Sequence, residues 1–293
     1  MIISSQGEVC SPNDDINALD MHGTNALRDS LLEIQRSTAG GEEALLASAE
    51  IELEQEKQAD KVELAKIEEA RQALQEFRDY LAQSPGVAAR ALPSEEDLLY
   101  IYNSETKECE ITRLDGQGIV LDLSGSNLQG ELPLPPQLMV TRLHCHGNEL
   151  TGLPKLPDSL TVLSCSRNQL TTLPELPDSL TDLNCSSNQL IALPELPDSL
   201  TLFNCRYNDL TALPELPASL PELWCDHNQL TTLPELPTSL TALICYNNQL
   251  TTLPVLPTSL IELWCGENPS LASDPATQAA LQAMRDRGGA VNL

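Results

Sequence analysis

The chain has 293 residues, among them two Phe, two Trp and five Tyr. So few aromatic side chains favour stacked aliphatic residues, as in a repeat array, over one globular core. The formal net charge is −27, and residues 168–284 contain a single Lys or Arg, Arg206. Nucleic acids and anionic membranes are bound through clustered basic side chains, so we expect neither as a partner.

The first twenty residues lack the cationic region and the apolar stretch of a Sec signal peptide. No segment of the chain approaches 18 consecutive apolar residues. We therefore expect neither Sec export nor a membrane span. Residues 1–15 are polar and are predicted to be a disordered leader.

Residues 16–107 are predicted to form a helical N-terminal region that begins with a short helix over about 16–36. The strongest helical segment is 42–83, where steps of three and four residues bring apolar side chains to one face. That face consists of Ile67, Ala70, Leu74, Phe77 and Leu81. A polar gap at residues 54–61 favours packing on a partner helix over a sustained coiled coil.

Two weaker signals follow the long helix. Ser94, with Asp97 three residues later, predicts an N-cap and a second helical stretch through about Tyr102. Residues 108–114 and 119–124 then flank a turn at Asp115-Gly116-Gln117-Gly118 and predict a β-hairpin. Such a hairpin would cover the open edge of the first strand in the array that follows.

A 20-residue pattern, L-x-x-L-x-C-x-x-N-x-L-x-x-L-P-x-L-P-x-S, begins at Val140, and residues 160–179 are a clean copy of it. This is the leucine-rich-repeat pattern at the short end of its length range. Residues 119–138 form a degenerate first copy, which brings the number of turns to eight. We expect an α+β fold: a solenoid over residues 108–270, comprising the hairpin and the repeats, behind the helical region.

Each repeat position has a predicted role. Alternation along a strand sends Leu163 and Cys165 into the core and Ser164 outward onto the concave face of a parallel sheet. Asn168 and its equivalents must bond backbone groups of neighbouring turns, because a buried amide needs partners, and so predict an asparagine ladder. Two prolines in each LPELPDSL return segment exclude an α-helix and predict an extended or polyproline-like convex side.

Residues 271–293 are predicted to cap the array, since one repeat alone cannot bury its leucine face. Asp274 is a typical N-cap, Pro275 suits the first helical position and Gly288 ends the helix. The packing side of this helix is predicted to consist of Ala280, Leu281 and Met284.

The repeat with its LPELPxSL return segment, the helical region before it and the missing Sec signal resemble the bacterial leucine-rich-repeat effectors of the YopM and IpaH/SlrP/SspH type. The similarity covers residues 118–270 strongly and the rest only in layout. Glu267-Asn268-Pro269 and the helix after it look like the junction at which the ubiquitin-ligase members continue into a catalytic domain. The nucleophilic Cys of that domain has no counterpart before Leu293, so the resemblance favours the non-enzymatic, YopM-like layout.

No motif predicts an active site, a cofactor or a metal centre. The seven repeat cysteines are expected to be small core residues, reduced and unpaired. They are Cys145, Cys165, Cys185, Cys205, Cys225, Cys245 and Cys265. His144 and His146 flank Cys145, but strand alternation places both histidines opposite the cysteine, so the three cannot bind one metal.

The concave face is where the repeats differ from one another. Its central outward position holds Trp224, Ile244 and Trp264 in three successive repeats, and Tyr246 lies beside them. An exposed aromatic row of this kind is a candidate hot spot for protein binding, unless the capping helix or another copy of the chain covers Trp264. The predicted polar surroundings of the row are Arg206, Asp226 and His227, and Tyr207 is a further aromatic residue predicted to bind the partner.

The sequence therefore predicts a protein-binding scaffold that captures a host protein on its concave face and is secreted without a Sec signal to act in the host cytoplasm. The N-terminal helices would serve secretion, a chaperone or a second partner. Two alternatives stay open: the substrate-recognition region of a ubiquitin ligase whose catalytic domain is not in this chain, and a repeat protein that remains in the bacterium.

Overall fold

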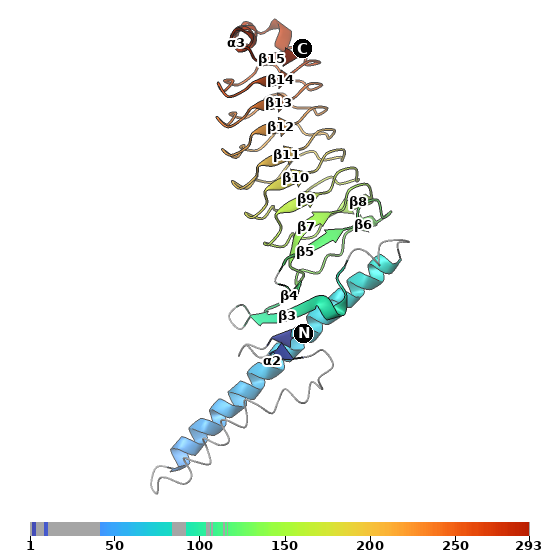
Figure 1. Cartoon of the computed structure of the whole chain (residues 1–293), viewed down its shortest axis with the longest axis vertical. Helices are drawn as coiled ribbons and strands as arrows, with labels where there is room; N and C mark the ends of the chain where they lie inside the picture. Colours follow the sequence, from blue (N-terminus) through green and yellow to red (C-terminus); the bar gives the residue numbers. More distant parts are fainter. Residues whose placement is uncertain are drawn as a thin grey trace. The chain divides into compact units, whose positions relative to one another are not determined.

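The computed structural model describes residues 2–3, 9–10, 42–83, 92–103, 106, 108–113, 115 and 117–292. The short helix predicted at 16–36 lies outside these residues. The chain forms two compact units, the first comprising 1–75 with 94–117 and the second comprising 76–93 with 118–293. Figure 1 shows the elements of both in chain order.

The long helix predicted at 42–83 is confirmed as α2 (Glu42–Ala82). The apolar stripe expected on one face is buried, with each of its five side chains at most 3% exposed. In the first unit, the guanidinium of Arg71 lies 5.3 Å from the centre of the Tyr100 ring. In the second unit, the Tyr80 hydroxyl donates to the Gln129 carbonyl oxygen at 3.4 Å.

The helical stretch predicted through Tyr102 is wrong. Only a single 3-10 turn, η2 (Glu95–Asp97), follows Ser94. The Asp97 amide donates to the Ser94 carbonyl oxygen at 3.0 Å, and the Ser94 hydroxyl donates to the Asp97 carboxylate at 2.7 Å. The chain then continues as strand β3 (Leu98–Asn103), whose residues LLYIYN are apolar, aromatic and β-branched. Burial of Leu98, Leu99 and Tyr100 in a sheet outweighs the local helical signal.

The hairpin predicted between residues 108–114 and 119–124 is also wrong, because its two strands belong to different sheets. Strand β4 (Glu108–Arg113) pairs antiparallel with β3, whereas β5 (Ile119–Asp122) pairs parallel with the repeat strand β7. The sheet of β4 also contains β1 (Ile2–Ile3) and β2 (Val9–Cys10), in the order β2-β1-β3-β4. These two short strands lie in the segment that was predicted to be a disordered leader.

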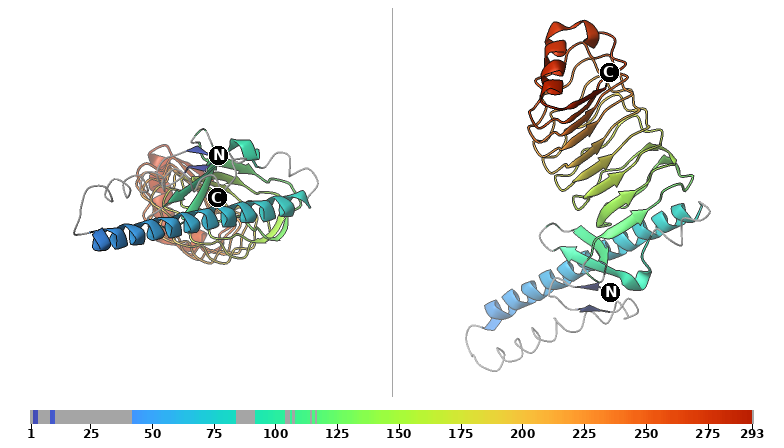
Figure 2. Two further views of the ribbon diagram at one scale, coloured as in Figure 1. Left: turned by 90° about the horizontal axis from the view of Figure 1, so that it is seen from below. Right: turned by 45° about the horizontal axis from the view of Figure 1, so that its top comes forward.

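The repeats build the nine-stranded parallel sheet shown in Figures 1 and 2, in the order β15-β14-β13-β12-β11-β10-β9-β7-β5. Eight of these strands come from the eight predicted repeats, and the ninth comes from the C-terminal segment. The strands are β5, β7 (Val140–His144), β9 (Val162–Ser164), β10 (Asp182–Asn184), β11 (Leu202–Asn204), β12 (Glu222–Trp224), β13 (Ala242–Ile244), β14 (Glu262–Trp264) and β15 (Ala290–Asn292). A small parallel sheet of β6 (Gln129–Glu131) and β8 (Glu149–Gly152) joins the first two repeats.

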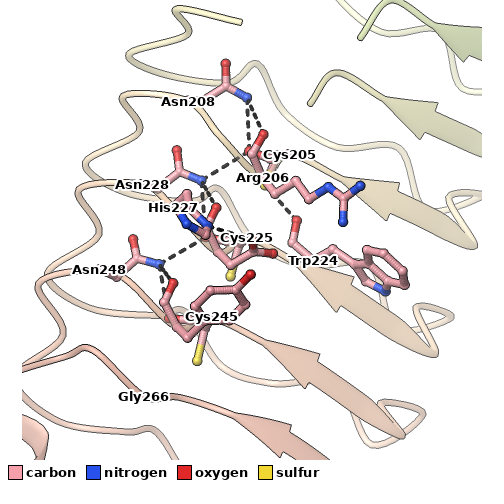
Figure 3. A network of polar contacts seen from close by, with 12 residues as sticks. Cys205, Arg206, Asn208, Trp224, Cys225, His227, Asn228, Cys245, Asn248 and Gly266 are labelled. Carbon is pink, nitrogen blue, oxygen red and sulfur yellow. Dashed lines mark hydrogen bonds and ion pairs between the residues drawn. The ribbon is translucent and has the colours of Figure 1, made fainter. Parts of the chain in front are cut away.

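The predicted asparagine ladder is confirmed. In a typical turn, Asn208 Nδ2 donates to the carbonyl oxygens of Cys185 and Cys205 at 3.1 and 3.0 Å, and its Oδ1 accepts from the Leu190 amide at 3.1 Å. Each amide therefore satisfies backbone groups of its own and the preceding turn, as a buried polar side chain requires. Figure 3 shows three consecutive rungs, Asn208, Asn228 and Asn248.

The residue before each ladder asparagine takes the left-handed conformation. Its φ is 55° at Tyr207 and 51° at His227, and the same position in the second repeat is Gly147 at 69°. Non-glycine residues adopt this region at a steric cost, so the ladder and the strand pairing on either side hold the turn in place.

The proline-rich return segments contain neither helix nor strand, as their two prolines predicted. Their serines replace part of the missing backbone bonding. Ser199 Oγ, for example, lies 2.7 Å from the Asp178 carbonyl oxygen and 2.6 Å from that of Leu180 in the preceding turn. The convex side is therefore held by a second ladder of side-chain hydrogen bonds.

The C-terminal cap follows the predicted pattern except that Thr277, and not the half-buried Ala280, completes the packing side of its helix, and it adds one strand. Helix α3 (Pro275–Asp286) is capped by Asp274, whose carboxylate accepts from the Thr277 amide at 2.8 Å, and Gly288 follows its end with a φ of 85°. Leu281 and Met284 are fully buried. The chain then forms β15, which pairs with β14 and extends the sheet beyond the last repeat. None of the described helices has the length and apolarity needed to cross a membrane.

Candidate protein-binding surface

The three residues of the predicted row occupy one line across the concave face. Trp224 pairs with Ile244 and Ile244 pairs with Trp264 in the registers of strands β12, β13 and β14. Trp264 is 42% exposed, whereas Trp224 and Ile244 are half-buried. The capping helix therefore does not cover Trp264, and the indole ring stays accessible.

Each tryptophan of this row is held by a glutamate two residues earlier in the same strand. Trp224 Nε1 donates to Glu222 at 3.2 Å, and Trp264 Nε1 donates to Glu262 at 2.7 Å. The leucine between them points into the core, so the glutamate and the tryptophan share the outer face. The hydrogen bond restricts each indole ring to one orientation on that face.

Arg206 lies against the first of these tryptophans. Its guanidinium carbon is 5.2 Å from the centre of the Trp224 ring, which is a cation–π distance. Figure 3 shows Arg206 and Trp224 projecting from neighbouring turns on the same side of the sheet. This contact accounts for part of the burial of Trp224.

A second aromatic group follows the strands. The rings of Tyr207 and His227 stack at 4.0 Å, His227 meets Tyr246 edge-on at 5.0 Å, and Tyr246 lies 6.5 Å from Trp264. The left-handed backbone at Tyr207 and His227 brings these side chains into register along the stack. The structure therefore unites all four predicted aromatic residues and His227 in one continuous surface.

Asp226 does not take the exposed place that the sequence analysis gave it. It is 1% exposed, and its Oδ2 lies 3.0 Å from His227 Nδ1. Because a carboxylate only accepts, His227 Nδ1 donates to it. Burial, and then the nearby Asp226 carboxylate, raise the pKa of the Tyr246 hydroxyl. Asp226 is thus an internal support for the rings of His227 and Tyr246.

A hollow of about 370 Å³ opens beside Trp224, between strands β11 and β12. Leu202, which is 49% exposed, lines it together with Asn204, Glu222 and Trp224. The sequence analysis missed Leu202, although the first outward position of its strand differs among repeats as strongly as the central one does. An apolar floor beside a fixed indole ring suits an inserted side chain of a protein partner.

The repeat cysteines are buried in the core and free of disulfide bonds, as predicted. Burial raises the pKa of Cys145 and of Cys185 from 9.0 to about 12. Such thiols are poor nucleophiles and poor metal ligands, because both roles need the thiolate. His146 Nδ1 instead lies 3.0 Å from Ser124 Oγ, and the described residues contain no cluster of three potential metal ligands.

The 20-residue turns, the asparagine ladder and the capped parallel sheet define a leucine-rich-repeat solenoid protein. No protein-family model and no curated protein matches the chain. Among solved structures, it is similar to YopM from Yersinia pestis, described as a leucine-rich effector protein, with 30% identity over 66% of this chain and a TM-score of 0.46. It is also similar to YopM from Yersinia enterocolitica WA-314, with 37% identity over 50% of this chain and a TM-score of 0.41.

A third similar structure is a Shigella effector leucine-rich-repeat domain, with 27% identity, 59% of this chain and 80% of that chain covered, and a TM-score of 0.41. The chain spans 60% of the first YopM structure and 40% of the second.

Proposed function

We propose that the chain is a protein-binding scaffold of the bacterial effector type, which captures a host protein on the concave face of its solenoid. The observation that supports this most directly is the row of Trp224, Ile244 and Trp264 on the concave face, with Tyr246 beside it. Large rings fixed in advance by hydrogen bonds and stacking lose little conformational entropy on binding.

We base the effector role, including delivery to the host cytoplasm without a Sec signal, on the resemblance of the repeats to the YopM-like proteins. The acidic charge of the chain agrees with a protein partner and disfavours a nucleic acid. A solenoid also suits this role physically, because its rigid sheet presents side chains from successive turns at a fixed spacing of about 4.8 Å.

Affinity capture from a eukaryotic lysate tests the proposal. The wild-type chain is compared with a Trp224→Ala/Trp264→Ala double variant, and captured proteins are identified by mass spectrometry. The matched control is an Ile191→Ala/Val255→Ala variant, which removes two exposed apolar side chains outside the repeat strands. A protein that is retained by the wild type and the control and lost by the double variant supports the proposal. Equal capture by all three overturns it.

A further inference from the structure

The concave face carries the same local arrangement twice. The tripeptide Glu-Leu-Trp occurs at residues 222–224 in β12 and at 262–264 in β14, two strands apart in the sheet. In both copies the indole Nε1 donates to the glutamate of its own tripeptide. Each copy thus offers an aromatic face and a carboxylate side by side, the two groups that a cation is attracted to.

The first copy is occupied by a cation from the chain itself. Arg206, one turn before Trp224, places its guanidinium 5.2 Å from the centre of that ring. The structure therefore contains an internal example of how the tryptophan of this arrangement accepts an arginine side chain over its ring.

The second copy has no such internal cation. The position equivalent to Arg206, one turn before Trp264, holds Tyr246, whose ring lies tilted at 6.5 Å from the indole. Arg206 is the only Lys or Arg between residues 168 and 284, and no cation–π contact to Trp264 occurs in the part of the chain that the structure describes. Trp264 is accordingly 42% exposed, and Glu262 is exposed as well.

A further carboxylate lies near the second copy, although the cap also brings two arginines close to this repeat, Arg285 near Cys265 and Arg287 at the Leu260 carbonyl oxygen. The buried Asp226 carboxylate acts on the Tyr246 hydroxyl, and its Oδ1 has no hydrogen-bond partner among the described residues. A guanidinium over the exposed Trp264 ring would lie beside the Tyr246 ring and near two carboxylates, Glu262 and Asp226. A carboxylate attracts a cation placed near it.

We propose that Glu262, Trp264 and Tyr246 form a binding site for an arginine side chain presented by the protein partner. This inference rests on the proposed function and specifies its partner, which must offer an arginine to the end of the concave face formed by β13 and β14. The chain's formal net charge of −27 favours such a basic segment from a distance, because opposite charges steer association.

The two tryptophans make the site directly observable. The 293-residue chain has two indole N–H groups, so its ¹H–¹⁵N spectrum contains two indole signals, which a Trp224→Phe variant assigns. The probe is the blocked peptide acetyl-Gly-Arg-Gly-amide, and the control probe carries Gln in place of Arg. We expect a saturable shift of the Trp264 signal with the arginine peptide and none with the glutamine peptide. Equal shifts with both probes, or no shift with either, would overturn the proposal.

Two matched substitutions sharpen this test. Glu262→Gln should weaken binding of the arginine peptide about threefold, the effect of removing one exposed carboxylate from a cation site, whereas Glu222→Gln should leave it unchanged. Arg206→Gln should empty the first copy, so that the Trp224 signal, unresponsive in the wild type, now shifts with the arginine peptide. A Trp224 signal that stays unresponsive in Arg206→Gln contradicts the role assigned to the Glu-Leu-Trp arrangement.

The two proposals can fail independently. If the arginine peptide shifts Trp264 but the double tryptophan variant still captures the same host proteins, the arginine site stands and the proposed function is wrong. If capture requires the tryptophans but the peptide does not shift Trp264, the proposed function stands and the arginine site is wrong.

Discussion

A single asparagine per turn bonds each repeat of this solenoid to its neighbour. The Asn208 side chain bonds the Leu190 amide and the carbonyl oxygens of Cys185 and Cys205 in the buried interior, and Asn208→Ala removes all three of these hydrogen bonds. We expect this variant to lower the free energy of unfolding by about 3 kcal/mol, measured by urea titration. Gln189→Ala, at an exposed position of the preceding turn, is the control and should change the free energy of unfolding little. A similar small effect of both variants would show that water replaces the ladder bonds.

The repeat thiols make the solenoid sensitive to alkali. Burial raises the pKa of Cys145 from 9.0 to about 12, so the folded state keeps its proton where the unfolded state loses it. Their contribution to stability is complete below pH 9 and is lost as the pH rises toward 12. We expect the array to unfold within this interval, as followed by circular dichroism. A Cys185→Ala/Cys225→Ala variant should unfold at a higher pH than the wild type, once the difference between their stabilities at pH 7 is taken into account.

The same thiols should resist alkylation in the native state. With a pKa of about 12, Cys185 is a thiolate in only about one molecule in ten thousand at pH 8. Mass spectrometry after iodoacetamide treatment at that pH should find the seven repeat cysteines unmodified, and modified once urea is added. Rapid native alkylation at any of them, or a disulfide between two, would contradict their placement in the core.

Among the elements, the C-terminal cap controls how far the last repeats fray. Leu281 of α3 is fully buried, and the buried Thr277 accepts the Leu253 amide of the last complete repeat at 3.2 Å. Leu281→Ala should cost about 3 kcal/mol. Because each turn contacts only its neighbours, this loss should be local. Hydrogen exchange should accelerate in β14 and β13 and stay unchanged in β9.

The control is Gln282→Ala, on the exposed side of the same helix. Uniform acceleration along the array would contradict nearest-neighbour stability.

At the scale of the whole molecule, the side chains that hold the array together and those proposed to bind a partner lie on different faces of one sheet. Leucine and cysteine side chains of the inner face hold the array together, whereas Trp224 lies on the outer face. We therefore expect Trp224→Ala to leave thermal stability nearly unchanged and to weaken partner binding by about 2 kcal/mol, the usual size of a hot-spot truncation. Calorimetry of unfolding and of binding measures the two effects separately. Unfolding of this variant, or undiminished affinity, would show that the row does not form the binding site.

The sequence by itself determined the repeat architecture. With a 20-residue period, equivalent positions of successive repeats have the same surroundings. We could therefore predict, position by position, the inward leucines and cysteines, the asparagine ladder and the helix-free return segments, and also the Asp274 cap. The same regularity identified the Trp224, Ile244 and Trp264 row, because equivalent positions in parallel repeats must lie side by side.

Only the tertiary structure decided matters that depend on partners distant in the sequence. Strand alternation in residues 108–124 could not show that β4 pairs with β3 and that β5 joins the repeats, since a strand's pattern reveals its faces but not its neighbour. The added strand β15, the burial of Asp226 beneath His227 and the placement of Arg206 on Trp224 likewise depend on contacts between turns. Outward side chains carry no periodic constraint, so their conformations follow from whichever neighbours the fold brings to them.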